Sequence, residues 1–310
     1  MKPSLKLDQV AGGEIGVFPL GDRLACAHSL KQVSVLRLDQ LHPLISGNKW
    51  FKLKYNLESA QQEGFDTLLS CGGPHSNHLH ALAAAGQVFG FKTRGLVRGY
   101  ENIPLTPTLE DCQRMGMALT FVDKKTYRQR YDSQWCQQQA EQYQSYWIPE
   151  GGNNSLGKQG CIEIAAMCDG YDEIWLSIGS GCTFLGVGAA LNEGSKLKRI
   201  KLKGIMAIKG GQDLKDELLL QLDGGDVDAE IDCDNHLGGF GRCPDELIDL
   251  IGDYDALGLP LDPVYTGKLV SAFERAWLAG ELDSNKRYLL IHSGGLQGRR
   301  GVSALSDNLP

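Results

Sequence analysis

Ser46-Gly47-Asn48-Lys49 opens the stretch around which this chain is organised, and Trp50-Phe51-Lys52-Leu53-Lys54-Tyr55-Asn56-Leu57 follows it. The first three residues favour a turn, and the run after Lys49 favours a helix. Lys49 is therefore expected at the start of a helix, where the positive end of the helix dipole disfavours a charged amine. It is either an ordinary solvated lysine or an amine that is kept neutral or used covalently.

Strands and helices alternate through the rest of the chain. The expected strands span residues 33–38, 67–71, 93–98, 119–122, 146–149, 173–178, 203–208 and 287–292. The expected helices span 49–64, 76–85, 108–115, 132–146, 157–168, 213–222, 245–251 and 267–279, with one more from Thr183 to about Asn192. This alternation predicts βα units and a mostly parallel sheet. The glycines and asparagines at 151–154 mark the best candidate for a domain boundary.

The composition limits the function classes. The 310 residues suffice for one large domain or two moderate ones, with 42% apolar and 22% charged residues. The net charge of −7 argues against a nucleic-acid-binding protein, which usually carries a basic surface. Residues 1–10 show no apolar leader, no membrane-spanning run is visible, and the nine cysteines form no C-x-x-C pair or zinc-like spacing. We therefore expect a cytosolic protein with reduced cysteines and no membrane partner.

Glycine is unusually frequent, with 39 residues where about 22 are expected from average usage. The most informative cluster is in Leu176-Ser177-Ile178-Gly179-Ser180-Gly181-Cys182-Thr183, a strand that turns into a helix. Its backbone N–H groups, the helix N-terminus and the hydroxyls of Ser180 and Thr183 favour a phosphate site over a tight structural turn. It is not a Walker A loop, and the six-residue dinucleotide fingerprint fails.

Three further turns carry polar side chains, two of them at strand ends and the third at the start of a helix. In Cys71-Gly72-Gly73-Pro74-His75-Ser76-Asn77-His78, Ser76 is either an N-cap or a reactive hydroxyl, and the Asn77 amide can reach a ligand oxygen. No metal is expected there, because histidines two residues apart do not share a helical face and no carboxylate accompanies them. Ser293 ends the last strand, and Tyr265 is either an acid/base candidate or a half-buried aromatic residue.

One ligand accounts for all of these elements. A phosphate loop, a reactive lysine, an amide and a hydroxyl at sheet edges fit pyridoxal 5'-phosphate. Its aldehyde reacts with a lysine, and its phosphate is held by a glycine-rich loop. The sequence therefore predicts a pyridoxal-phosphate site that contains Lys49.

The chain resembles the fold-type II pyridoxal-phosphate enzymes, in particular the 1-aminocyclopropane-1-carboxylate deaminase and D-cysteine desulfhydrase family. The matching segments, in the family's order, are Ser46-Gly47-Asn48-Lys49, Gly72-Gly73-x-x-Ser76-Asn77-His78, Pro149-Glu150-Gly151-Gly152, Gly179-Ser180-Gly181-Cys182-Thr183, Asp262-Pro263-Val264-Tyr265-Thr266-Gly267-Lys268 and His292-Ser293-Gly294-Gly295. The resemblance implies a tryptophan synthase β-like α/β fold with two open, twisted, mostly parallel sheets flanked by helices. It also implies a large cofactor-binding domain of residues 1–57 and 158–310, a small α/β domain of residues 58–157, and often a homodimer.

The same resemblance implies roles for individual residues. Lys49 binds the cofactor covalently and moves the substrate's Cα proton, Ser76 acts on the opposite face as nucleophile or second base, and Tyr265 is the third catalytic candidate. The cofactor is further bound by Asn77, at the ring oxygen O3′, and by Gly179, Ser180, Gly181, Cys182, Thr183 and Ser293. The substrate, a small amino acid, is expected to meet Ser76, Asn77, His78, Phe240, Tyr265 and Thr266.

Three positions narrow the activity. The deaminases carry a glutamate where this chain has Thr266 and a leucine where it has Ser293. The hydroxyl of Ser293, next to His292, resembles the desulfhydrase pattern. A hydroxyl near the pyridine nitrogen favours its protonation less than a carboxylate does, which suits elimination of a good leaving group. Phe240 replaces a family tyrosine, and Gln297-Gly298-Arg299-Arg300 departs from the family pattern after the double glycine.

We expect a pyridoxal-phosphate-dependent lyase that catalyses α,β-elimination of D-cysteine, or a related β-substituted amino acid, to pyruvate, ammonia and a thiol. One alternative is a 1-aminocyclopropane-1-carboxylate deaminase that produces 2-oxobutanoate and ammonia. Another is a protein that binds the cofactor without turnover. A nucleotide-binding oxidoreductase is disfavoured because the glycine fingerprint fails.

Overall fold

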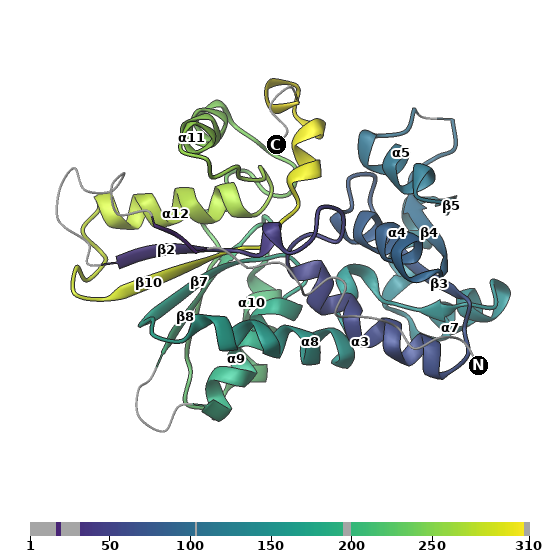
Figure 1. Cartoon of the computed structure of the whole chain (residues 1–310), viewed down its shortest axis with the longest axis horizontal. Coiled ribbons are helices and arrows are strands. Elements are labelled where there is room, and N and C mark those ends of the chain that lie inside the picture. The colour runs from purple at the N-terminus through teal and green to yellow at the C-terminus, as the bar shows by residue number, and fades with distance from the viewer. Residues whose placement is uncertain (1–16, 20–31, 103, 195–199, 307–310) are drawn as a thin grey trace.

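The computed structural model describes residues 17–19, 32–102, 104–194 and 200–306 (Figure 1). The strands are β1 (Val17–Pro19), β2 (Gln32–Arg37), β3 (Thr67–Gly72), β4 (Lys92–Arg98), β5 (Met117–Val122), β6 (Tyr146–Trp147), β7 (Glu173–Ile178), β8 (Lys201–Met206), β9 (Asp228–Asp232) and β10 (Arg287–His292). The α-helices are α3 (Asn48–Gln62), α4 (Asn77–Phe89), α5 (Pro107–Arg114), α6 (Lys124–Tyr127), α7 (Ser133–Gln142), α8 (Ser155–Ala165), α9 (Cys182–Gly194), α10 (Gln212–Leu222), α11 (Asp245–Ala256) and α12 (Thr266–Leu278). Short 3₁₀ helices are η1 (Leu38–Gln40), η2 (Arg128–Tyr131), η3 (Glu150–Gly152), η4 (Ala166–Cys168), η5 (Leu296–Gly301) and η6 (Ser303–Leu305).

The strands form two separate sheets. The larger sheet has the order β1-β2-β10-β7-β8-β9, and all its neighbours are parallel except the β1–β2 pair. The smaller sheet has the order β5-β4-β3-β6 and is parallel throughout. The predicted α/β fold, with two open, mostly parallel sheets flanked by helices, is confirmed.

Both faces of the larger sheet are buried by helices. Figure 1 shows α11 and α12 on one face, and α8, α9 and α10 on the other. Side chains alternate between the faces, so that Trp175 packs in the cluster under α11 and α12 whereas Ile174 and Leu176 join the cluster on the opposite side. Burial on both faces explains why the central strands read as continuous apolar runs in the sequence.

The smaller sheet is built from one continuous stretch of the chain, since its strands all fall between residues 67 and 147. The division into residues 1–57 with 158–310 and residues 58–157 stays a prediction. Residues 1–16 and 20–31 of its first segment lie outside the described part of the chain.

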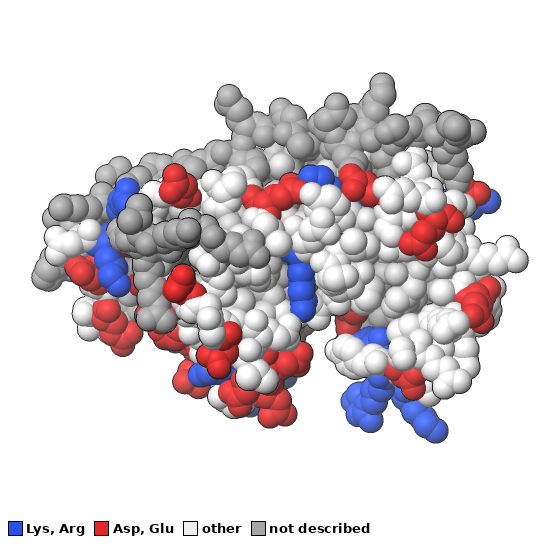
Figure 2. Space-filling model, turned by 90° about the horizontal axis from the view of Figure 1, so that it is seen from below, with Lys and Arg blue, Asp and Glu red and all other residues white. Residues whose placement is uncertain are grey.

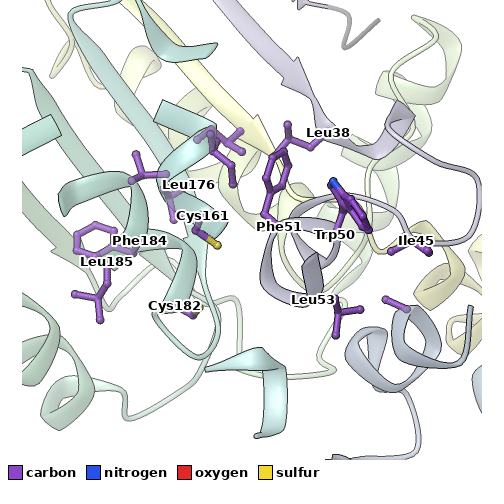
Figure 3. Packing of buried hydrophobic residues seen from close by; sticks show 14 of the residues in the cluster. Leu38, Ile45, Trp50, Phe51, Leu53, Cys161, Leu176, Cys182, Phe184 and Leu185 are labelled. Carbon is purple, nitrogen blue, oxygen red and sulfur yellow. The ribbon is translucent and has the colours of Figure 1, made fainter. Parts of the chain in front are cut away.

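Helix α8 packs closely against both α3 and α9. This packing holds the start of α3 near the loop after β7, because that loop leads directly into α9. Gly160 of α8 lies directly against the carbonyl oxygen of Phe51 of α3, where a side-chain Cβ has no room. Figure 3 shows Phe51 and Cys161 in one buried cluster, which continues to Cys182 and Phe184. The small residues of α8 therefore determine how near Lys49 can come to the glycine loop.

Several element boundaries differ from the sequence prediction. Strand β9 and helix α6 were not predicted, because β9 reads Asp-Ala-Glu-Ile-Asp at the sheet edge and α6 spans one turn capped by Asp123. The strand predicted at 203–208 begins two residues earlier, since β8 is Lys201–Met206. The predicted helix 132–146 ends at Gln142, and α11 continues to Ala256, five residues past the predicted end.

Among the described residues, no helix combines the length and apolar character needed to span a membrane. On the face in Figure 2, acidic and basic side chains are interspersed, and acidic ones gather at the lower left.

Candidate active site

The turn before Lys49 is locked to the end of the larger sheet. The Asn48 N–H donates to the carbonyl oxygen of Ser293 at 3.2 Å, and Gly47 lies directly against the same carbonyl. Gly47 has φ +68, a left-handed conformation that favours glycine, and is the N-cap position of α3. This contact joins two of the predicted segments and, as predicted, places Lys49 in the first turn of a helix.

The Lys49 amine is held by its neighbours. Its Nζ donates to Asn48 Oδ1 at 2.6 Å and lies 5.9 Å from the centroid of the Tyr265 ring. Burial lowers the pKa of Lys49 to about 7, and the positive charge of Lys52 acts in the same direction. A large share of the Lys49 amine is therefore neutral near pH 7, whereas the amine of an ordinary solvated lysine is almost fully charged at this pH. A neutral amine can act as a nucleophile and as a base.

Lys52 is a second amine at the site and was not among the residues predicted from the sequence. Its side chain is 5% exposed, and its Nζ donates to Ser180 Oγ at 3.5 Å. Lys52 follows Lys49 by three residues, a spacing that puts both on one helical face, and this spacing is visible in the sequence. A buried cation beside a glycine loop attracts an anion strongly, because little water screens it.

The predicted phosphate loop connects β7 to α9. Ser180 contacts Lys52, and Thr183 Oγ1 accepts a 2.9 Å hydrogen bond from Asn48 Nδ2. Gly179 packs on the Tyr265 ring, and a Cβ added to this glycine would lie 3.0 Å from the ring edge. The first N–H groups of α9 have no acceptor within their helix, so the loop offers donors and a helix dipole to an anion.

Cys182 begins α9 with its thiol turned inward. Its Sγ contacts the Gly152 carbonyl oxygen at 3.4 Å, and Cys161 lies beside it in the buried cluster (Figure 3). A hydrogen bond from Cys161 and the charge of Lys52 lower the pKa of Cys182, although burial acts in the opposite direction. Contact between Cys182 and a phosphate stays a prediction, and its backbone N–H group at the start of α9 is the part available for it.

The turn after β3 places Ser76 and Asn77 at the start of α4. Ser76 is the N-cap of α4, since its Oγ accepts a 3.2 Å hydrogen bond from the Leu79 N–H. Both side chains are partly exposed. Asn77 Oδ1 accepts a hydrogen bond from Gln297 Nε2 at 2.9 Å, so its amide is already oriented.

His78, predicted to contact the substrate, points its ring into the protein. It is 3% exposed, and its Nε2 is 2.9 Å from Ser70 Oγ on β3. Burial, together with the charges of Lys49 and Lys52, lowers the pKa of His78 to about 3, so the ring is neutral. Contact between His78 and the substrate stays a prediction, and the backbone at the start of α4 is the part available for it.

The segment before α12 is organised by Asp262. This fully buried carboxylate accepts hydrogen bonds from the N–H groups of Val264, Tyr265 and Thr266, at 2.9, 2.8 and 2.7 Å. Its role as a backbone cap was not predicted, although an aspartate before a helix is a known start signal. It fixes the backbone of Tyr265 and Thr266, and the Tyr265 ring lies beside Lys49 and Gly179 of the glycine loop.

Tyr265, Thr266 and Phe240 occupy different surroundings. Burial raises the pKa of the Tyr265 phenol above its ordinary value, so the phenol stays protonated. Phe240 is 57% exposed and stacks edge-on against Tyr265, with ring centroids 5.6 Å apart. The Thr266 hydroxyl is buried and has no hydrogen-bond partner among the described residues. Ser293 meets the start of α3 through its backbone, while its neighbour His292 is buried and bonds the carbonyl oxygen of Pro260.

Comparison with known proteins identifies the family. The sequence profile of the family described as pyridoxal-phosphate dependent enzyme matches residues 14–294. The chain belongs to this family. It is therefore a pyridoxal-phosphate-dependent enzyme, and the resemblance predicted from the six segments is confirmed.

Relatives of this pyridoxal-phosphate-dependent enzyme cover most of its length. A Pyrococcus horikoshii protein, provisionally named 1-aminocyclopropane-1-carboxylate deaminase, is 29% identical over 273 residues, which are 82% of this chain and 81% of the relative. D-cysteine desulfhydrase from Salmonella newport is 27% identical over 289 residues, which are 84% and 86% of the two chains. The crystal structure of a 1-aminocyclopropane-1-carboxylate deaminase homologue has a TM-score of 0.80 and 24% identity, over 96% of this chain and 95% of the other. These matches support a fold-type II architecture.

The residues of this pyridoxal-phosphate-dependent enzyme fit its cofactor. Lys49 supplies a partly neutral amine, and Lys52 with Ser180 and the N-terminus of α9 suits a phosphate group. The unpartnered Thr266 hydroxyl supports the same conclusion, because buried polar atoms normally have a partner and a ligand atom can provide one. Elements of both sheets contribute, since Asn77 starts a helix of the smaller sheet and the other residues belong to the larger one.

Proposed function

We propose that this protein is a pyridoxal-phosphate-dependent lyase that eliminates the β-substituent of a small amino acid. The favoured substrate is D-cysteine or a related β-substituted amino acid. With water, D-cysteine is converted to pyruvate, ammonia and sulfide, and other substrates release the corresponding thiol. The observation that carries the proposal is the buried, uncharged Thr266 hydroxyl, which follows Tyr265 in the chain and has no partner among the described residues. The Tyr265 ring in turn lies 5.9 Å from the Lys49 amine.

Lys49 supports both covalent attachment and proton transfer. Bound pyridoxal phosphate withdraws electrons from the substrate's Cα and so makes its proton acidic. An amine with a pKa of about 7 is suited to accept that proton and to return it near neutral pH. Ser76 is proposed as the second base or nucleophile from the opposite face, and Tyr265 as a protonated acid near the leaving group.

Thr266 favours elimination because a hydroxyl stays uncharged. A carboxylate at this position stabilises a positive charge on the pyridine nitrogen and deepens the electron sink, whereas a hydroxyl does so weakly. A good leaving group such as a thiolate needs less help from the ring, because it carries the electrons away itself. The name of the Salmonella relative, D-cysteine desulfhydrase, supports this choice.

The alternative substrate is 1-aminocyclopropane-1-carboxylate, which a deaminase converts to 2-oxobutanoate and ammonia. The provisional names of the relatives from Pyrococcus horikoshii and Thermotoga maritima favour it. The product separates the two proposals, since pyruvate with sulfide and 2-oxobutanoate are measured by different assays. A protein without turnover yields neither product from any amino acid.

Two measurements test the proposed function. Purified protein incubated with pyridoxal phosphate is expected to show the absorbance band of lysine-bound cofactor, and Lys49→Ala is expected to remove it. Lys54→Ala is the matched control, because Lys54 lies on the same helix but pairs with Glu163 at 2.7 Å. A screen of D- and L-amino acids for keto-acid release then identifies the substrate, and release of 2-oxobutanoate alone would contradict elimination of D-cysteine.

We also propose a cytoplasmic homodimer whose partners are a small amino acid and a second copy of the chain, with neither nucleic acid nor membrane involved. The eight cysteines of the described residues are all free thiols, as expected in a reducing compartment. Light scattering after size-exclusion chromatography measures the oligomeric state, and a mass of one chain would contradict the dimer.

A further inference from the structure

The 3₁₀ helix η5, which follows β10, connects the larger sheet to the helices of the smaller one. It contains Gln297, Arg299 and Arg300, the residues at which the sequence departs from its family's pattern. Gln297 contacts α4, and Arg300 contacts α5. The segment therefore reaches the start of α4, where Asn77 lies.

The contact between Gln297 and Asn77 has a defined direction. Gln297 Nε2 donates to Asn77 Oδ1 at 2.9 Å. An amide whose oxygen is used in this way must present its NH₂ group elsewhere. Gly295 lies directly against Asn77 Nδ2, so the NH₂ group faces the turn after β10, and this turn also contacts Gly47 at the start of Lys49's helix.

Two arginines anchor η5 to two different helices, α11 and α5. Arg299 is completely buried, and its guanidinium forms a two-point ion pair with Asp255 of α11 that includes a 2.8 Å hydrogen bond. Arg300 pairs with Asp111 of α5, whose carboxylate also lies 3.5 Å from His80 of α4. Two-point arginine contacts fix geometry better than single charges do, so Gln297 has little freedom to move.

We propose that Gln297 is a positioning residue that fixes the Asn77 amide with its NH₂ group directed to the phenolic oxygen of bound pyridoxal phosphate. This inference rests on the proposed function, in which Asn77 contacts that oxygen. A deprotonated phenolic oxygen only accepts hydrogen bonds. It therefore attracts the NH₂ group of the Asn77 amide and repels the amide oxygen when that oxygen faces it. Gln297 excludes the wrong orientation because it occupies the amide oxygen.

Substitution of Gln297 by glutamate and by methionine tests this directly. Glutamate has nearly the same shape but only accepts hydrogen bonds, so it reverses the Asn77 amide. Methionine keeps the side-chain volume but cannot form this hydrogen bond, so the Asn77 amide can adopt either orientation. Gln297→Glu is expected to weaken pyridoxal-phosphate binding about tenfold, and Gln297→Met about threefold or less. The pH midpoint of the cofactor's absorbance band is expected to move by about one unit in Gln297→Glu and to move less in Gln297→Met.

Binding of inorganic phosphate separates orientation from charge. If the carboxylate of Gln297→Glu acts only through its charge, it weakens phosphate binding as much as cofactor binding. If it acts by reversing the Asn77 amide, phosphate binding stays unchanged. Equal effects of the two variants on the absorbance band, or unchanged spectra in both, would overturn the inference. Absence of the band in the wild-type protein would instead overturn the proposed function, and melting temperatures close to wild type show that the variants fold.

Discussion

At the scale of single residues, the function depends on two lysines that share one face of α3. Their charges repel each other, and with burial this repulsion keeps the Lys49 amine partly neutral. Lys52, in contact with Ser180, is placed to attract a phosphate while it lowers the pKa of its neighbour. The amine placed for covalent chemistry, Lys49, and the amine placed for anion binding, Lys52, thus lie one helical turn apart.

Removal of the Lys52 charge is expected to raise the pKa of Lys49. Below its pKa the amine is charged and unreactive, so the rate of covalent attachment of an aldehyde rises with pH through a midpoint of about 7 in the wild type. In Lys52→Met the midpoint moves upward, by about half a unit to one unit, and attachment below pH 7 becomes slower. The measurement uses pyridoxal without phosphate on apoprotein, so that a lost phosphate contact has no effect. Lys54→Met is the control, and an unchanged or lower midpoint in Lys52→Met would contradict the electrostatic argument.

At the scale of elements, the close packing of α3 on α8 determines where Lys49 lies. Gly160→Ala places a methyl group against the Phe51 carbonyl, which belongs to the helix backbone and cannot turn aside. We expect a loss of about 2–3 kcal/mol of unfolding free energy, together with weaker cofactor binding, because α3 must move. Urea denaturation with and without pyridoxal phosphate measures both effects.

Gly252→Ala is the matched control for this prediction. Gly252 is exposed on α11, and a Cβ there meets no atom within 4 Å. Alanine is expected to stabilise the protein by about 0.5–1 kcal/mol, since it reduces the entropy lost on folding. If Gly160→Ala had the same effect as Gly252→Ala, the tight contact between α3 and α8 would not control stability.

The sequence predicts those parts of the fold and site whose signals are local. The apolar runs of β7 and β10, the turn before Lys49 and the glycines before α9 each carry their own pattern, so their elements were found. Lys52 and Gln297 were not selected, because their importance depends on contacts with Ser180 and Asn77 more than 100 residues away. Strand β9 was missed because its polar residues suit a sheet edge, a position that only the tertiary arrangement defines.

At the scale of the whole molecule, the site joins two sheets that share no strand. The phosphate loop and Lys52 belong to the part built around the larger sheet, whereas Ser76 and Asn77 start a helix of the smaller one. A ligand that contacts both parts couples them, while a fragment of that ligand stabilises only the part it touches.

Hydrogen exchange distinguishes these two cases. Inorganic phosphate is expected to slow amide exchange at residues 179–185 only, because it reaches Lys52 and the N-terminus of α9. Pyridoxal phosphate is expected to slow exchange there and also at residues 75–80, since its ring reaches the start of α4. The Lys52→Met variant loses the phosphate effect but keeps part of the protection by pyridoxal phosphate, which Lys49 still holds covalently. Protection of residues 75–80 by phosphate alone would show that the anion binds between the sheets, and that the division of the ligand between them is wrong.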